Sequence, residues 1–320
     1  MRLGVVVLAY RNPEQVALLV SALRHPDVRV YLHVDARSPW PPFRQALERS
    51  GDGRVHTLAR RATPWGGPAI VDASVDGLAA AVADDCDYVL QISGQDLPLW
   101  YTDRLVAFFR DNLHKSFMQH VPLPTDRWRL GGRLRTECYS YQVRGRRETH
   151  VPRSMEVPMS WKGRILNAFL GLRSLLRPPR TFPDCAAPHG GSSGWNLSRP
   201  AVEHVLAFLE AHPEYRRYHE DSLLPDEIFF QSIVAGTWFA RDHEIVDDAL
   251  RFQIWRADAS HGGTRTLSGL PAAGEARGAH PRTLTLDDLP ALGEAQEPFA
   301  RKFDMEADPQ VVRAVLEARR

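Results

Sequence analysis

Two adjacent carboxylates, Asp226 and Glu227, begin the segment PDEIFF at residues 225–230. A carboxylate that faces a cleft can act as a general base and take a proton from a hydroxyl group. Two acids are also common in the first turn of a helix, where the positive end of the macrodipole stabilises negative charge. The pair by itself is therefore compatible with a catalytic base and with a purely structural helix start.

Two adjacent cations, Arg301 and Lys302, lie between Phe299 and Phe303 in the segment EPFARKFD. The chain has 40 basic and 39 acidic residues and a formal net charge of +1, so it has no overall field that would attract anions. An anion site must therefore be local. Cations held by aromatic neighbours would suit such a site, whereas a solvated surface pair is the alternative interpretation.

Strand-like and helix-like segments alternate through the first third of the chain. The nearly continuous apolar runs are LGVVVLAY, VRVYLHVD and YVLQIS. Three helical patterns lie between them: one begins at Asn12, one includes FRQALERS, and one covers about residues 69–83. Such runs between helices predict a parallel sheet covered on both faces, which is a doubly wound α/β architecture. Ligands of these sheets bind beyond the carboxyl ends of the strands. The polar residues at these ends are Tyr10, Arg11, Asp35, Arg37, Ser93, Gln95 and Asp96.

Capping signals mark several helices. Asn12 is expected to cap the first helix, with Gln15 completing a capping box. Ser198 is a plausible cap for the helix in LSRPAVEHVLAFLEAH, PDEIFFQSIVAG is expected to open another helix, and Asp308 is expected to cap the last one. Residues 257–279 are rich in Ala and Gly and predict a long loop.

Several classes of protein are disfavoured. The first strand is not followed by GxGxxG, and no Walker A loop occurs, so a dinucleotide oxidoreductase or a P-loop enzyme is not expected. Cys86, Cys138 and Cys185 are odd in number and lack CxxC spacing, which argues against a disulfide framework and structural zinc. The basic clusters RWRLGGRLR and RPPRTFP are more typical of solvated loops than of a nucleic-acid or lipid-headgroup patch.

Targeting and membrane segments are not expected either. The apolar start MRLGVVVLAY runs directly into Arg11 without a cleavage site, so it reads as a strand and not as a signal peptide. No stretch approaches the roughly 20 apolar residues of a spanning helix. The run ILNAFLGLRSLL is interrupted by Arg173. The sequence thus indicates a soluble or peripheral protein.

An ordered series of motifs carries a family resemblance. The series consists of LAYRNPEQ, HVDARS, WGG, SGQDLPLW, GSSGWNLSRPAVEHVL, LLPDEIFFQSIV, LRFQIW, HPRTLTLDDLP and FARKFD. It resembles the core-2/I-branching β-1,6-N-acetylglucosaminyltransferase family, which includes the peptide O-xylosyltransferases, and is weakest over residues 119–185. The resemblance implies one GT-A-type domain over residues 1–320, a Rossmann-like mixed sheet with helices on both faces. Residues 1–118 would form the nucleotide-binding half and residues 119–320 the acceptor- and diphosphate-binding half.

The resemblance also implies roles for individual residues. Glu227 would be the general base, and Arg301 and Lys302 would stabilise the diphosphate of UDP together with Arg282 or the nearby Arg277. Asp35 would hold the uridine. The other implied UDP- or donor-binding residues are Ala9, Tyr10, Arg37, Gln95 and Asp96, and the implied acceptor-binding residues are Trp195, Trp255 and Arg127.

The expected function is inverting transfer of a sugar from UDP to a hydroxyl of a glycan or glycoconjugate, without a divalent metal or other cofactor. UDP-GlcNAc is the expected donor and UDP-xylose the alternative. A non-catalytic carbohydrate- or nucleotide-binding module is a further alternative, and no nucleic-acid partner is expected. Because the anchor and disulfide cysteines of the secretory enzymes are missing, the chain resembles a short bacterial member, expected in the cytoplasm or peripherally at the inner face of the membrane.

Overall fold

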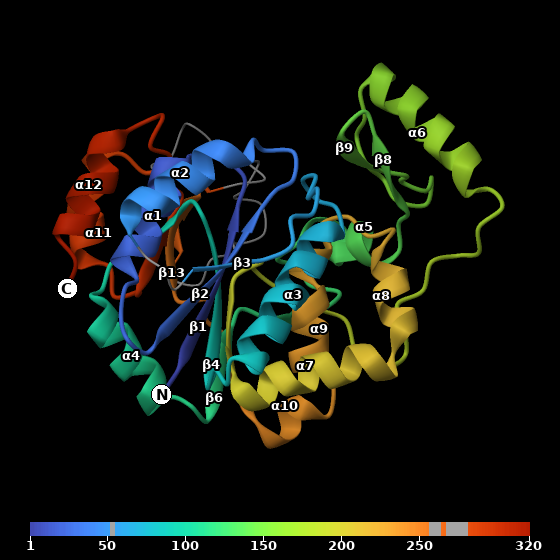
Figure 1. Ribbon diagram of the computed structural model, residues 1–320. Helices are drawn as coiled ribbons and strands as arrows, with labels where there is room; N and C mark the ends of the chain where they lie inside the picture. Colours follow the sequence, from blue (N-terminus) through green and yellow to red (C-terminus); the bar gives the residue numbers. More distant parts are fainter. Residues whose placement is uncertain (52–54, 256–263, 267–280) are drawn as a thin grey trace.

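A seven-stranded mixed sheet forms the centre of the computed structural model, which describes residues 1–51, 55–255, 264–266 and 281–320 (Figure 1). Its strand order is β12-β6-β11-β4-β1-β2-β3. The strands are β1 (Leu3–Ala9), β2 (Val28–Val34), β3 (Val55–Thr57), β4 (Tyr88–Ser93), β6 (Lys115–Met118), β11 (Trp195–Ser198) and β12 (Glu244–Val246).

Strands β3, β2, β1 and β4 run parallel to one another, and the apolar runs predict three of them, β1, β2 and β4. At the other edge of the sheet, β12 runs parallel to β6. The register pairs Ala9 with Val34 and Leu8 with Ser93, so the carboxyl ends of the three long strands meet at one edge. Strand β11 runs antiparallel to both β4 and β6, which makes the sheet mixed. The polar residues that follow β1, β2 and β4 are thereby brought together.

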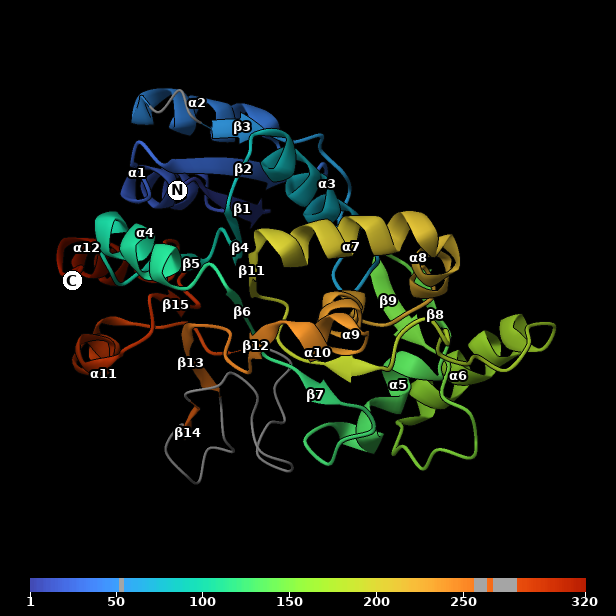
Figure 2. The same cartoon turned by 90° about the horizontal axis from the view of Figure 1, so that it is seen from below.

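Helices cover both faces of the sheet, which confirms the predicted fold class (Figure 2). On one face, α1, α2, α4, α11 and α12 pack against a core that includes Val5, Leu32 and Leu90. On the other face, α3, α7, α9 and α10 pack around Val6, Val89 and Leu197. The helices are α1 (Pro13–Ala22), α2 (Trp40–Ser50), α3 (Ala69–Ala83), α4 (Thr102–Asp111), α5 (Arg133–Thr136), α6 (Trp161–Ser174), α7 (Arg199–Ala211), α8 (Pro213–His219), α9 (Phe229–Ala235), α10 (Phe239–Asp242), α11 (Leu289–Glu294) and α12 (Pro309–Glu317).

A second, four-stranded sheet places the basic pair near the C-terminus. Its order is β14-β13-β15-β5, formed by β5 (Asp96–Pro98), β13 (Arg251–Trp255), β14 (Thr264–Thr266) and β15 (Phe299–Arg301). Phe299 and Phe303 are fully buried in the core, so they anchor the chain on either side of Arg301 and Lys302. The aromatic neighbours therefore fix where the two cations lie.

Short strands and α6 form an arm that projects from the body beyond α5 and α8 (Figure 1). The arm contains β8 (Ser140–Val143) paired with β9 (Arg146–Thr149), and α6 follows them. A separate pair, β7 (Val121–Pro122) with β10 (His189–Gly190), lies near its base. Within the described ranges, no helix combines the length and the apolar character that crossing a bilayer requires.

Some local predictions are wrong because tertiary partners compete with helix ends. Asn12 has a left-handed backbone (φ 54°), and its amide donates a hydrogen bond to Asp304 at 2.7 Å instead of capping α1. The buried Gln15 completes no capping box, since its side chain donates to the Gly94 carbonyl and accepts from the Met305 amide. These contacts attach α1 to the C-terminal segment.

The other predictions of helix ends are partly confirmed and partly wrong. Ser198 precedes α7 but makes no side-chain cap, because its hydroxyl lies beside that of Ser116 at 3.2 Å. The segment PDEIFFQSIVAG is a 3-10 turn over Pro225–Glu227 followed by α9, and the two are separated at Ile228. Asp308 caps α12 as predicted, accepting from the amides of the second and third residues after it. Of the predicted loop 257–279, all but residues 264–266 lie outside the described residues.

Candidate active site

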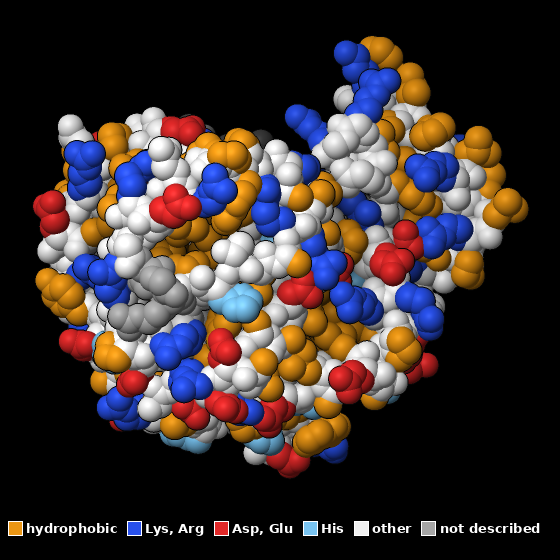
Figure 3. Space-filling model, viewed as in Figure 1, with side chains coloured by type: hydrophobic (Ala, Val, Ile, Leu, Met, Phe, Trp, Pro, Cys, Tyr) orange, Lys and Arg blue, Asp and Glu red, His pale blue; other side chains and the backbone are white. Residues whose placement is uncertain are grey.

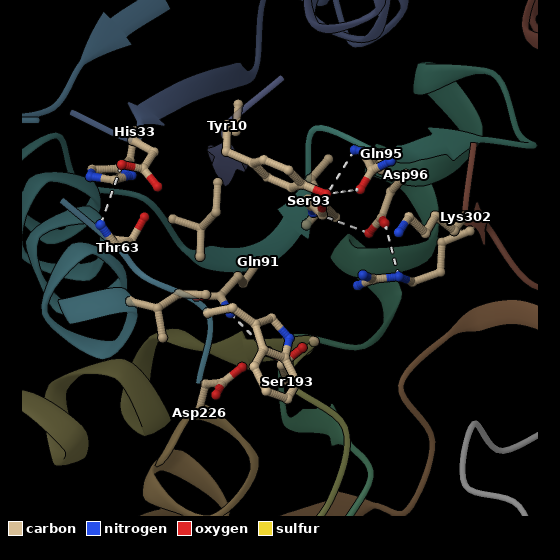
Figure 4. Close-up of a pocket in the computed structure, with 18 of the residues that line it drawn as sticks. Tyr10, His33, Thr63, Gln91, Ser93, Gln95, Asp96, Ser193, Asp226 and Lys302 are labelled. Atoms are coloured by element: carbon tan, nitrogen blue, oxygen red, sulfur yellow. Dashed lines mark hydrogen bonds and ion pairs between the residues drawn. The ribbon is translucent and has the colours of Figure 1, made fainter. Parts of the chain in front are cut away.

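A pocket of about 370 Å³ opens where the carboxyl ends of β1, β2 and β4 meet (Figure 4). It also takes residues from the loop before β11, from the 3-10 turn that precedes α9 and from the end of β15. Nine residues predicted for the site line it: Ala9, Tyr10, Asp35, Arg37, Gln95, Asp96, Glu227, Arg301 and Lys302. Segments far apart in the sequence therefore converge on one cavity.

Asp35 lies at the end of β2 and is held as a carboxylate. It accepts hydrogen bonds from the Arg37 amide (2.9 Å) and guanidinium (3.1 Å to Nε) and from the Thr63 amide (3.4 Å). Burial would raise the pKa of Asp35, but these hydrogen bonds outweigh burial and lower the pKa to about 2. The neighbouring His33 is buried, accepts from the Arg61 amide at 3.0 Å, and has its pKa lowered by burial. This side of the pocket is thus rigid and polar.

Gln95 connects the β4–β5 turn to the C-terminal segment. Its side-chain oxygen accepts from the Tyr10 hydroxyl at 2.8 Å, and its side-chain nitrogen donates to the Phe303 carbonyl at 3.2 Å. The Gln95 carbonyl in turn accepts from the Phe303 amide at 2.9 Å. The turn therefore fixes the backbone next to Lys302.

Asp96 lies at the pocket floor, and its side chain has no exposed surface. Its carboxylate is 3.3 Å from Nε of Arg251 and 3.6 Å from Nε of Arg301. Arg251 is equally buried and also donates to the carbonyls of Ala249 and Gln91. Asp96 therefore acts as a counter-ion that joins β5 to β13 and β15, a role that the motif SGQD did not reveal.

Lys302 offers a cation to the pocket. Among the described residues, its ammonium group has no hydrogen-bond or ion-pair partner, although the carboxylate of Asp304 acts on it at longer range. Burial, followed by the charges of Arg301 and Arg11, lowers its pKa. A half-buried ammonium group without a partner is poised to bind an anion that enters the pocket.

The carboxylate pair lies in the 3-10 turn before α9. Glu227 accepts two hydrogen bonds from the Arg135 guanidinium, one of them from Nε at 2.8 Å. Arg135 itself stacks over the Trp128 ring, 4.2 Å from the centroid. Arg135 was not predicted, since nothing local links it to a residue 92 positions away.

Asp226 differs from its neighbour because it is buried and has a side-chain oxygen without a partner in the described structure. Burial, reinforced by the negative charge of Glu227, raises the pKa of Asp226 to about 7. In Figure 4 the side chain of Asp226 lies near Ser193, and Lys302 lies on the opposite side of the group of residues drawn. The pair therefore consists of one carboxylate fixed by arginine and one buried carboxyl group whose pKa is raised.

The glycine-rich loop before β11 reaches the pair because Gly191 has no side chain. The Gly191 amide donates to the Glu227 carbonyl at 2.8 Å. A Cβ atom at this position would lie 1.9 Å from the Gln119 carbonyl oxygen. Only glycine therefore allows this approach.

Other predicted residues lie away from the pocket lining. Trp195 has no exposed surface and packs against Phe230, so the prediction that its ring flanks an acceptor is wrong. Arg282 pairs with Asp288 (2.8 Å from Nη1), although the adjacent Pro281 lines the pocket. Trp255 and the exposed Arg127 are not among the lining residues. Arg277 lies outside the described residues.

The Core-2/I-Branching enzyme family has a sequence model that matches residues 6–289 of this chain. The chain belongs to this family. Similar proteins include xylosyltransferase 1 of Rattus norvegicus, 27% identical over 260 residues, which are 78% of this chain and 27% of that protein. Xylosyltransferase oxt of Drosophila pseudoobscura pseudoobscura is 26% identical over 261 residues, which are 77% of this chain and 25% of that protein. This chain therefore spans about a quarter of the length of these relatives.

Two solved structures show a distant similarity to this chain. S. aureus TarS 1-349 in complex with UDP covers 37% of this chain, and the match covers 35% of that chain, with 20% identity and a TM-score of 0.28. A 4-diphosphocytidyl-2C-methyl-D-erythritol synthase from Anaerococcus prevotii matches 77% of this chain and 87% of its own, with 11% identity and a TM-score of 0.37.

Proposed function

We propose that this protein is an inverting glycosyltransferase that moves a sugar from a UDP-sugar to a hydroxyl of a glycan or glycoconjugate. The observation that carries the proposal is one pocket that holds the carboxyl pair Asp226 and Glu227 and the ammonium group of Lys302, which has no partner among the described residues. Cations can stabilise a leaving diphosphate, and a carboxylate can accept the acceptor proton. Membership of the Core-2/I-Branching enzyme family supports the same activity.

In the proposed reaction, Glu227 takes the proton of the acceptor hydroxyl while that oxygen bonds to the anomeric carbon. The bond between this carbon and the UDP oxygen breaks at the same time, and its electron pair leaves with UDP. Lys302 and Arg301 then face the negative charge that grows on the diphosphate. Arg135 keeps Glu227 oriented, because it donates two hydrogen bonds to one carboxylate oxygen.

Metal independence is part of the proposal. A divalent cation in such a pocket would need free carboxylate oxygens. Asp35 is paired with Arg37, Asp96 with Arg251 and Glu227 with Arg135. The fourth carboxyl group, Asp226, has a raised pKa and is buried. The arginines thus occupy the groups that a metal would require, and the C-terminal cations take its place.

The donor sugar has two candidates. Membership of the Core-2/I-Branching enzyme family favours UDP-GlcNAc as the donor. The similarity to xylosyltransferases favours UDP-xylose. Discrimination between the two would depend on whether the pocket accepts the N-acetyl group and the C6 carbon that xylose lacks.

Release of UDP from each donor in EDTA tests this function. We would incubate the purified protein with UDP-GlcNAc or UDP-xylose, with water or a panel of glycans as acceptor, and identify products by mass spectrometry. The proposal expects that UDP is released with one of the two donors. It also expects that the mass of one acceptor in the panel increases by one sugar residue of that donor. Binding of a donor without UDP release would instead indicate a non-catalytic module, and strict dependence on manganese would contradict the metal-free mechanism.

A further inference from the structure

The outward face of α6, with the two residues after it, exposes large apolar side chains. We call this surface the α6 face. Ile165 is 63% exposed, Leu172 is 66% exposed and Leu176 is 99% exposed. From Trp161 to Leu176 its members recur at intervals of three or four residues, with Leu175 beside Leu176, so they share one side of the helix. The α6 face consists of Trp161, Ile165, Phe169, Leu172, Leu175 and Leu176.

The opposite side of α6 is attached to the arm. Asn167 exchanges two hydrogen bonds with the Val151 backbone, at 2.7 and 2.9 Å, and Leu170 is buried. The Ser174 hydroxyl lies 2.8 Å from that of Tyr141 in β8. These contacts fix the rotation of the helix, so the apolar face points outward because its other side is already packed.

Cations flank the α6 face, and acids are absent from this part of the sequence. Residues 157–183 contain Lys162, Arg164, Arg173, Arg177 and Arg180 but no Asp or Glu. Lys162, Arg164 and Arg173 are exposed. On a helix of 3.6 residues per turn, Lys162 and Arg173 fall on one flank of the apolar stripe and Arg164 falls on the other. Figure 3 shows apolar and basic side chains together on the projecting arm.

We propose that the α6 face binds the surface of an anionic phospholipid bilayer, with the helix lying parallel to the membrane plane. An apolar stripe bordered by cations suits this position, because the stripe enters the acyl boundary while the cations meet lipid phosphates. Trp161 at the start of the helix suits the headgroup region. The α6 helix has 14 residues, too few to span the hydrocarbon core, so it lies on the membrane.

Charge distinguishes this occupant from a second copy of the chain. In a symmetric dimer through the α6 face, each copy would bring the same three cations to the interface. Residues 157–183 provide no acid to pair with them. An anionic lipid surface neutralises these cations. The inference does not depend on the proposed transferase activity, since it rests on α6 and not on the pocket.

Vesicle sedimentation tests the membrane proposal. The probes are vesicles of phosphatidylcholine alone and vesicles of phosphatidylcholine with phosphatidylglycerol in equal amounts. We expect the wild-type protein to bind the anionic vesicles preferentially. The charge variant Lys162→Gln/Arg164→Gln/Arg173→Gln should bind them about 100-fold more weakly, from about 5-fold per basic side chain. The apolar variant Ile165→Ser/Phe169→Ser/Leu172→Ser should lose binding to both vesicle types.

A matched control replaces exposed apolar side chains elsewhere, Leu113→Ser/Trp238→Ser, and should bind as the wild type does. All substituted positions are exposed, and circular dichroism would check that each variant is folded. Failure of the folded wild-type protein to sediment with anionic vesicles would overturn the proposal. So would a dimer in sedimentation velocity that only the apolar variant abolishes, because the α6 face would then be covered by a second copy.

Discussion

Glu227 and Asp226 are adjacent but differ in their partners. Glu227 is fixed by Arg135, whereas Asp226 is buried with an unpartnered oxygen. The family resemblance singles out Glu227 as the expected base through its motif. The sequence could not predict Arg135, because this partner is brought near only by the folded chain, and it could not predict which acid is buried.

Replacing Glu227 tests its role as general base. Glu227→Gln should lower turnover by about 10²-fold or more, because the amide cannot take the acceptor proton. UDP affinity should change little, and steady-state kinetics with calorimetry would measure both. Glu137→Gln is a matched control, since Glu137 pairs with Arg133 on the surface. Wild-type turnover in Glu227→Gln would remove the assignment.

Asp226 makes stability depend on pH. Its folded pKa of about 7 exceeds the ordinary value of 3.8, so the folded state binds the proton more tightly than the unfolded state. This contribution to stability is fully present at pH below the ordinary pKa and is lost as pH rises through 7. Asp226→Asn removes the ionisation cost, so its melting temperature relative to wild type should rise between pH 5 and pH 8.

Each kcal/mol by which Asp226→Asn stabilises the folded state should raise the melting temperature by roughly 2 °C for a large domain. Differential scanning calorimetry at the two pH values would measure the difference between variant and wild type. A difference that stays constant with pH would show that Asp226 is already ionised at pH 5.

The buried pair of Arg251 and Asp96 joins two strands of the second sheet. Arg251 opens β13 and Asp96 opens β5, and β15 runs between these strands. The pair therefore supports the element that carries Arg301. The motif LRFQIW gave no signal for this role, because a buried arginine is recognised only by its partners across 155 positions.

Arg251→Met should destabilise the fold by about 3 kcal/mol or more, since removing one partner leaves the other as a buried charge. Urea denaturation would measure the loss. The double variant Arg251→Met/Asp96→Asn should recover part of it, because the unpaired carboxylate is then gone. A single variant within about 0.5 kcal/mol of wild type would contradict a structural role for this ion pair.

Element prediction succeeded where periodicity is strong and failed where tertiary contacts compete. Residues 69–83 form α3, and YVLQIS forms β4, because their apolar positions match helix and strand packing. Asn12 and Gln15 match a capping pattern, yet they bind the C-terminal segment, which local sequence cannot reveal. The sequence showed ILNAFLGLRSLL only as an apolar run interrupted by Arg173, and the structure shows that most of its large apolar side chains face outward.

At the scale of the whole molecule, the candidate site depends on both ends of the chain. Strands β1, β2 and β4 provide one wall, and the segment after β15 provides the cations. Asn12 and Gln15 connect these parts through Asp304 and Met305. The side chains of the α6 face do not line the pocket, so we expect mutations to separate the proposed membrane binding from catalysis. A cytoplasmic location stays a prediction.

Isothermal calorimetry of UDP and uridine in EDTA, with wild type and Lys302→Ala, tests the proposal that Lys302 and Arg301 bind the diphosphate in place of a metal. Wild type should bind UDP without metal. Lys302→Ala should bind UDP about 10-fold more weakly or worse, from the loss of one charge-assisted hydrogen bond, with uridine affinity unchanged. Lys162→Ala on α6 is the control. If Lys302→Ala weakened the affinities for UDP and uridine equally, or if the wild type did not bind UDP without metal, this proposal would be wrong.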